Sequence, residues 1–296
     1  MVMTREDTKR KFAEIRTWIR GEQRAPHKPL LVLYALGQLQ QGERWLDYGG
    51  NEEQLIRLLA EFGPPRRSYH VNYPFVRLVN DGVWQLSEAI DTKADQGIGF
   101  LRQGKISGGF TQEILDAFAS DPSLAGEIAA MLLEQNFPET MHEDILEAVG
   151  LTTEPEYAIS RQRRRDPGFR DRILQAYEYR CAVCGFDVRL GTRVIALEAA
   201  HIKWHQAGGP DIEQNGIAMC TMHHKLFDRG AFTLGDSLEF LVSEAAHGTS
   251  GLDEWLLRYH GTEIRPPQSP VYLPGDGYLA WHVREVFRGS ARYQAG

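Results

Sequence analysis

Two short pairs of metal-binding residues constrain this chain more than any other feature. Cys181 and Cys184 are separated by two residues, and Cys220 and His223 repeat that spacing further along the chain. A structural zinc ion takes four thiolate or imidazole ligands in a tetrahedron, and two such pairs supply them. The chain has 3 cysteines, and this pattern uses all of them. The sequence therefore predicts a zinc site rather than a disulfide framework.

Polar residues suited to phosphodiester hydrolysis lie between and just after these pairs. Residues 195–202 alternate like a strand and contain His201, and Asn215 follows in a loop. His224 begins a predicted helix, in which Asp228 lies on the same face four residues later. Hydrolysis needs a base to activate water and a cation to stabilise charge on the phosphate. His201 can be the base, with Asn215 or a backbone carbonyl accepting from its second ring nitrogen. His224 and Asp228 can hold the cation.

Residues 168–240 resemble the HNH, or ββα-metal, endonucleases. The motifs that carry the resemblance are Leu-Glu-Ala-Ala-His-Ile at 197–202, Asn-Gly at 215–216 and His-Lys-Leu-Phe-Asp-Arg-Gly at 224–230. The resemblance implies His201 as the general base, Asn215 as the residue that fixes the loop, and His224 as a ligand of the catalytic cation.

One position departs from the family pattern. Many members carry an acidic residue or a histidine directly before the base, as a further ligand of the cation, whereas this chain has Ala200 there. The departure makes Asp228 more important as a ligand. Glu198 lies on the same strand, but alternation places it on the opposite face from His201. We therefore expect Glu198 to contribute indirectly at most.

The charge is distributed unevenly. The formal net charge is -7, but residues 1–80 carry 13 Lys and Arg against 9 Asp and Glu, and residues 156–232 carry 12 against 9. Residues 81–155 carry 3 against 14. A DNA-binding face needs a local positive potential rather than a basic total. No apolar run is long enough to cross a membrane, and the first residues have no signal core. We expect a protein of the reducing bacterial cytoplasm.

The hydrophobic pattern predicts an α+β chain of two domains. Its first 150 residues read as mostly helical with a small hairpin, residues 151–166 as a basic linker, and residues 167–296 as the nuclease domain with a C-terminal extension. The helices expected in the first domain cover 6–20, 28–41, 51–62, two segments within 111–135, and 141–149. The hairpin is expected at 74–87, around Asn80-Asp81-Gly82.

The first domain resembles the sulfur-binding domain that precedes an HNH domain in type IV restriction endonucleases, which cut DNA with a phosphorothioate backbone. The segments that carry the resemblance are 25–31, 69–78, 80–84 and 101–110. Sulfur is larger and more weakly hydrated than oxygen, so an apolar cup with a cationic rim would prefer it. The resemblance implies Tyr73 and Pro74 in the cup, and His27, Lys28 and Arg102 at the rim. Arg66 and Arg67 lie in a Pro-rich loop and can follow the DNA backbone.

These features together predict a modification-dependent DNA endonuclease. Its reader binds phosphorothioated double-stranded DNA, and its HNH centre uses a divalent cation such as Mg²⁺ or Mn²⁺, beside the structural Zn²⁺. Two alternatives remain open at this point. The first domain could instead read a modified base such as methylcytosine and be joined to the same nuclease domain, or the chain could be a catalytically silent zinc-finger regulator. One cutting centre per chain makes a homodimer a further possibility.

Overall fold

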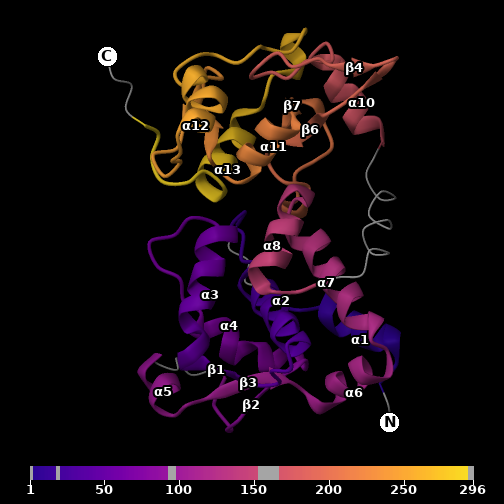
Figure 1. The fold of residues 1–296 in the computed structure, drawn as a ribbon, viewed down its shortest axis with the longest axis vertical. Coiled ribbons are helices and arrows are strands. Elements are labelled where there is room, and N and C mark those ends of the chain that lie inside the picture. The colour runs from indigo at the N-terminus through magenta and orange to yellow at the C-terminus, as the bar shows by residue number, and fades with distance from the viewer. Residues whose placement is uncertain (1–2, 18–20, 93–97, 153–166, 293–296) are drawn as a thin grey trace. The chain divides into compact units, whose positions relative to one another are not determined.

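In the computed structural model, residues 3–17, 21–92, 98–152 and 167–292 are described. The chain divides into two compact units, Met1–Arg163 and Arg164–Gly296. The first is largely helical with one small sheet and the second carries short strands and helices (Figure 1), which confirms the α+β class. Most of the predicted basic linker, residues 153–166, lies outside the described residues.

Unit 1 is built around one apolar helix, α2 (His27–Gln40), in which every residue from Pro29 to Gly37 is buried. It packs against α3, α4, α7 and α8. Gly37 permits the contact with α8, because a Cβ there would lie 2.0 Å from the carbonyl oxygen of Val149. The other helices of unit 1 are α1 (Arg5–Ala13), α3 (Tyr48–Phe62), α4 (Asn72–Arg77), α5 (Ile98–Gln103), α6 (Gln112–Ser120), α7 (Ser123–Asn136) and α8 (His142–Val149), with 3-10 turns η1 (Leu78–Asp81) and η2 (Glu139–Met141).

The sheet of unit 1 differs from the predicted hairpin. Its antiparallel strands lie in the order β1 (Leu46–Asp47), β3 (Ser107–Phe110), β2 (Trp84–Leu86). The hairpin prediction for 74–87 is wrong, because α4 and η1 occupy its first half. The buried side chains of Val71, Phe75 and Leu78 follow a helical repeat that a short window cannot distinguish from alternation.

The first predicted helix is shorter than expected. It was expected to cover 6–20, but α1 ends at Ala13 with Glu14 as its C-cap. The backbone N–H of Arg16 donates to the Asp81 carboxylate at 2.9 Å instead of continuing the helical ladder. The other helices predicted for this unit are confirmed, with ends shifted by a few residues.

Unit 2 places a two-stranded antiparallel ribbon, β6 (Leu197–His201) and β7 (Gly216–Cys220), beside the helix α11 (Thr221–Asp228). The helix α10 (Pro167–Ala176) packs against both strands of this ribbon. The remaining elements are β4 (Arg189–Leu190), β5 (Arg193–Val194), β8 (Phe232–Leu234), β9 (Phe240–Val242), α12 (Ser250–Trp255) and α13 (Asp276–Glu285), with 3-10 turns η4 (His205–Ala207), η5 (Glu213–Asn215), η6 (Leu257–Tyr259) and η7 (Pro270–Tyr272).

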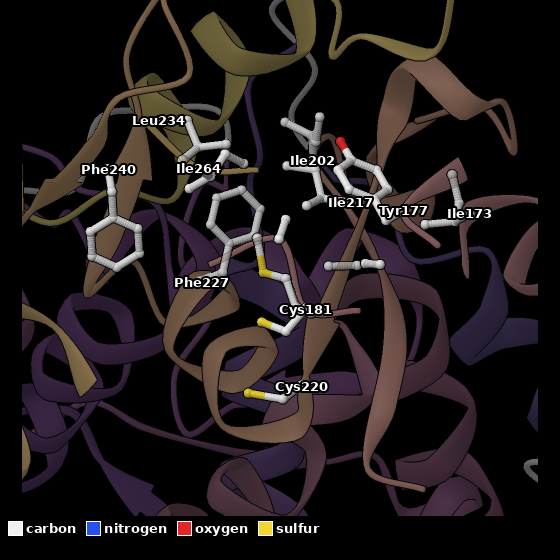
Figure 2. Close-up of a cluster of buried hydrophobic side chains, with 14 of the residues drawn as sticks. Ile173, Tyr177, Cys181, Ile202, Ile217, Cys220, Phe227, Leu234, Phe240 and Ile264 are labelled. Carbon is white, nitrogen blue, oxygen red and sulfur yellow. The ribbon is translucent and has the colours of Figure 1, made fainter. Parts of the chain in front are cut away.

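The core of unit 2 joins these elements around α11. Figure 2 shows Phe227 of α11 among Ile217, Leu234 and Ile264, with Cys181 and Cys220 at one edge of the cluster. Residues after 235 therefore complete the core of the unit. Within the described part of the chain, no helix combines the length and apolarity required to span a bilayer.

Candidate functional site

The four predicted zinc ligands converge. Cys181, Cys184, Cys220 and His223 offer one ligand atom each, and these atoms all lie within 4.8 Å of one another. Cys184 Sγ lies 3.9 Å from Cys220 Sγ, while His223 Nδ1 lies 3.2 Å from Cys220 Sγ and 3.7 Å from Cys181 Sγ. A tetrahedron with zinc–sulfur bonds of about 2.3 Å has edges of about 3.8 Å. The donor set and its spacing therefore fit one zinc ion.

The orientation of His223 is fixed by a hydrogen bond to the backbone of α12. Its Nε2 lies 3.0 Å from the carbonyl oxygen of Trp255, which can only accept a hydrogen bond. The proton therefore lies on Nε2, and Nδ1 faces the cysteines as a ligand must. The rings of Phe232, Phe240 and Tyr259 also surround the imidazole, at centroid distances of 6.2, 6.3 and 5.6 Å.

His201 lies at the end of β6 and contacts a carboxylate. Its Nε2 lies 2.7 Å from Oδ1 of Asp211, and its ring stacks on Phe169 with centroids 4.2 Å apart. An ionised carboxylate only accepts, so Nε2 carries the proton and Nδ1 keeps its lone pair. Arg172 of α10 holds the backbone carbonyl of Asp211 at 2.8 Å. The partner of Nε2 is thus Asp211, and not Asn215, which was one of the two acceptors expected from the sequence.

Asn215 instead closes the loop that follows His201. Its buried amide accepts from the backbone N–H of Lys203 at 2.8 Å and donates to the carbonyls of Lys203 and Pro210. The loop is tight at Gly209, where a Cβ would lie 1.8 Å from the carbonyl oxygen of Lys203. These contacts give Asn215 the geometry of a loop-fixing residue, because they hold Lys203 and Pro210, the residue directly before Asp211, to one buried side chain.

His224 lies between two carboxylates. Its Nδ1 is 2.6 Å from Glu198 and its Nε2 is 3.2 Å from Asp228, whose side chain is only 2% exposed. Burial disfavours the charged imidazole, but the two carboxylates outweigh that penalty and raise the pKa of His224 to about 9. Glu198 does face away from His201, yet it reaches His224 directly. Glu198 therefore contacts the predicted cation ligand itself.

His224 together with either carboxylate can supply ligand atoms to a divalent cation. A carboxylate and an imidazole supply the oxygen and nitrogen atoms that Mn²⁺ and Mg²⁺ accept. The ring can offer only one nitrogen to a cation, so the other must donate to the remaining carboxylate.

A buried histidine of α13 packs against α11. His282 of α13 stacks on Phe227 with centroids 3.7 Å apart, and its Nε2 lies 3.1 Å from the Phe227 carbonyl oxygen. Its Nδ1 lies 3.0 Å from the Thr233 hydroxyl. Burial lowers the pKa of His282 to about 4, against an ordinary value of 6.5. The ring is therefore neutral at physiological pH and holds the helix that carries His224.

In unit 1, Pro74 of the predicted cup and His27 of the predicted rim line one apolar depression. It lies between α2, α3 and α4. Its walls consist of His27, Pro74 and five aliphatic side chains: Leu30, Leu31, Leu55, Leu59 and Val71. Tyr73 contacts His70, with ring centroids 5.7 Å apart, and carries the Arg77 guanidinium over its face at 4.8 Å.

The cationic residues predicted around this depression have different surroundings. Burial, and then the charges of Arg66 and His70, lower the pKa of His27, so these three groups lie close together. Arg67 is exposed. Lys28 is paired with the buried carboxylate of Asp81, which gives it a partner inside the unit.

Arg102 is paired too, although it remains accessible. Its guanidinium lies 2.6 Å from the buried carboxylate of Glu52, and its side chain is 59% exposed. Two contacting residues were missed by the sequence prediction: His70 and Asp211. Asp211 could have been predicted, because it is an acidic residue in the loop between His201 and Asn215. His70 could not, because only the folded structure shows its contact with Tyr73.

Comparisons with known proteins follow this division. The family model "ScoMcrA-like, DNA sulfur-binding domain" matches residues 5–154, and the model "HNH endonuclease" matches residues 181–235. No curated protein matches the chain. Among solved structures, the sulfur-binding domain of ScoMcrA complexed with phosphorothioated DNA is 23% identical, with a TM-score of 0.41, over 48% of this chain and 94% of that one. The sulfur-binding domain of SprMcrA complexed with phosphorothioated DNA is 22% identical, with a TM-score of 0.43, over 50% of this chain and 94% of that one.

Proposed function

The chain belongs to the ScoMcrA-like DNA sulfur-binding domain family and carries an HNH endonuclease domain, and from this premise we propose that it is a phosphorothioate-dependent DNA restriction endonuclease. Unit 1 recognises a phosphorothioate in double-stranded DNA, and unit 2 hydrolyses a phosphodiester bond near it. One observation carries the proposal: a sulfur-binding domain and an HNH endonuclease domain are joined in a single chain.

The apolar depression of unit 1 suits a sulfur atom. Burial of a soft, weakly hydrated sulfur against Pro74 and aliphatic side chains costs less than burial of a strongly hydrated phosphate oxygen. Arg66 near its edge supplies positive charge for the phosphorothioate anion, and the neutral ring of His27 forms part of its wall. Tyr73 completes the cup, Arg67 tracks the backbone, and Lys28 and Arg102 add charge at the rim.

His201 is the general base of the reaction. With the Nε2 proton held by Asp211, Nδ1 can take a proton from water, and the carboxylate stabilises the imidazolium that forms. Stacking on Phe169 limits rotation of the ring. Asn215 fixes the loop that carries Asp211, so it acts through the position of the base.

His224 holds the catalytic cation, Mg²⁺, Mn²⁺ or a similar ion, together with a carboxylate. When bound, the cation stabilises negative charge on the phosphate and the leaving oxygen. The Glu198 side chain is 41% exposed and Asp228 only 2%, so Glu198 lies on the side that DNA can reach. Glu198 therefore shares the cation with His224, and Asp228 accepts from Nε2 and orients the ring. The sequence had assigned the cation to His224 and Asp228.

A cleavage assay with three matched plasmids tests the proposal. One carries phosphorothioates, one carries methylcytosine, and one is unmodified, and each is digested in a series of Mg²⁺ and Mn²⁺ concentrations. We expect cleavage of the phosphorothioated plasmid alone, and none by His201→Ala, which should still bind it. Preference for the methylated plasmid would favour the base reader, and binding without cleavage in any cation would favour the silent regulator.

The partner is double-stranded DNA, and we place the protein in the bacterial cytoplasm, where its substrate is found. Because each chain has one HNH centre, a double-strand cut requires two chains or two successive visits. A homodimer on DNA would satisfy this requirement. Sedimentation of the complex with a single phosphorothioated duplex would distinguish one bound chain from two.

A further inference from the structure

We propose that His201, His205 and Asp211 form a second metal site, separate from the cysteine site, and that a transition-metal ion bound there switches the nuclease off. The ligand class is a borderline-soft divalent ion such as Zn²⁺. Binding of the ion depends only on the three side chains. Loss of cleavage rests in addition on the proposed role of His201 as the base.

The three side chains converge without any contribution from the cysteine site. Each offers one ligand atom, and these atoms lie within 4.8 Å of one another. Asp211 Oδ1 is 2.7 Å from His201 Nε2 and 3.6 Å from His205 Nδ1. The arrangement is already collected around one carboxylate oxygen, so an ion requires small side-chain shifts rather than a new loop.

The loop is held in a form that keeps these ligands together. Arg172 fixes the backbone at Asp211, and the Asn215 amide fixes Lys203 and Pro210 on either side of the turn. The side chain of His205 is 67% exposed, against 21% for His201 and 28% for Asp211. An ion from solution therefore reaches His205 first and then meets two partly shielded ligands.

The donor atoms select the type of ion. Two imidazoles and one carboxylate resemble the three-ligand sites that hold zinc with one open position. Mg²⁺ prefers an all-oxygen environment and releases its waters reluctantly, so it competes poorly for two imidazole nitrogens. Zinc in excess can consequently occupy this site while Mg²⁺ remains with His224 and Glu198.

An ion at this site removes the base by changing its tautomer. Without the ion, Nε2 carries the proton and donates a hydrogen bond to Asp211, so the lone pair on Nδ1 can accept a proton from water. When a metal ion takes Nε2, a neutral imidazole must carry its one proton on Nδ1. That nitrogen then donates rather than accepts, and it cannot deprotonate water. The ion also engages Asp211, which stabilises the protonated form of His201 during the reaction.

Zinc stoichiometry provides the first test. The full-length protein with its cysteine site loaded is dialysed against rising concentrations of ZnCl₂, and bound zinc is measured by elemental analysis. We expect a second equivalent in the parent protein, and a rise of about tenfold or more in its dissociation constant in His205→Asn. The control is His247→Asn, which removes an exposed histidine from another loop and should bind as the parent does. A single equivalent in the parent, or equal binding by His205→Asn, would overturn the proposed site.

Inhibition provides the second test. Cleavage of phosphorothioated plasmid in fixed Mg²⁺ is followed as ZnCl₂ is added. Without added zinc, His205→Asn should cut like the parent, and with zinc its inhibition midpoint should rise by about tenfold. Equal inhibition of both proteins would place the inhibitory ion elsewhere and refute the switch. If no plasmid is cut by any protein, the proposed function fails, while the stoichiometry still decides whether the metal site exists.

Discussion

A carboxylate oxygen of Glu198 lies 2.6 Å from Nδ1 of His224, although one residue belongs to a strand and the other to a helix. Antiparallel pairing of β6 with β7, which leads directly into α11, produces this contact. The chain has Ala200 directly before His201, where the HNH pattern leads one to expect an acidic residue or a histidine. Glu198, three residues before His201, instead brings a carboxylate to His224 of α11.

We expect Glu198→Gln to weaken binding of the catalytic cation. The amide keeps the size of the side chain but loses the charge that attracts the ion. The Mn²⁺ concentration for half-maximal cleavage should rise by about tenfold to a hundredfold. Glu263→Gln removes an exposed carboxylate from another loop and serves as the control. An unchanged Mn²⁺ requirement in Glu198→Gln would show that Glu198 is not a ligand.

Cys184→Ser should release the structural zinc and unfold unit 2. A serine hydroxyl is a poor zinc ligand, and structural zinc sites contribute directly to folding. We expect one bound zinc fewer per chain and loss of the thermal transition that belongs to this unit. Unit 1 has its own core, so binding to phosphorothioated DNA should persist. Retained zinc with full cleavage would contradict the four-ligand assignment.

Arg67→Ala should weaken binding to phosphorothioated and unmodified duplexes by the same factor. An exposed arginine that contacts the backbone contributes through phosphate charge rather than through sulfur. The slope of log binding constant against log salt concentration should fall in magnitude by about one. Arg57 is a suitable control, because it is an exposed arginine paired with Glu53 on α3. A loss confined to the phosphorothioated duplex would assign Arg67 to the sulfur pocket instead.

His282 should make the stability of unit 2 depend on pH. Its pKa is lowered to about 4 in the folded protein, so the unfolded chain binds a proton more readily. The stabilisation is present above pH 6.5 and is lost as the pH falls toward 4. Between pH 7.5 and 5 the free energy of unfolding should fall by roughly 2 kcal/mol from this group.

Denaturant unfolding at the two pH values measures this loss. His282→Gln should show a smaller difference between them, because glutamine does not titrate, whereas exposed His247→Gln should behave like the parent. Zinc release in acid affects all three proteins, so the comparison isolates the contribution of the buried ring. An identical pH dependence in His282→Gln would show that the histidine does not titrate as proposed.

The convergence of Cys181, Cys184, Cys220 and His223 was predictable from the sequence, because ligand spacing is a local property. Cys181 and Cys220 lie far apart in the chain, yet each begins a pair with the two-residue spacing that is typical of zinc sites. The helix α2 was also predictable, since its apolar run is too long for a strand. Asn215 was predicted to fix a loop, and its three hydrogen bonds have the geometry of that role.

Other features depended on contacts that no local pattern encodes. The end of α1 is set by Asp81, and the partner of His201 comes from a loop whose course depends on Gly209. Residues 74–87 contain apolar positions that satisfy strand and helix periods equally, so only packing in the core decided between them. The surroundings of Lys28 were likewise invisible, because its partner lies 53 residues away.

The hydrogen bond between His223 and the Trp255 carbonyl limits how short a recombinant fragment of the nuclease domain can be. The HNH match ends at residue 235, so a recombinant fragment cut there would contain all four zinc ligands. It would lack the backbone carbonyl that orients His223, and it would expose the apolar side of α11 that Ile264 and His282 help to cover. The smallest autonomous cutter is therefore larger than its motif, and grafting experiments should carry the chain through to α13.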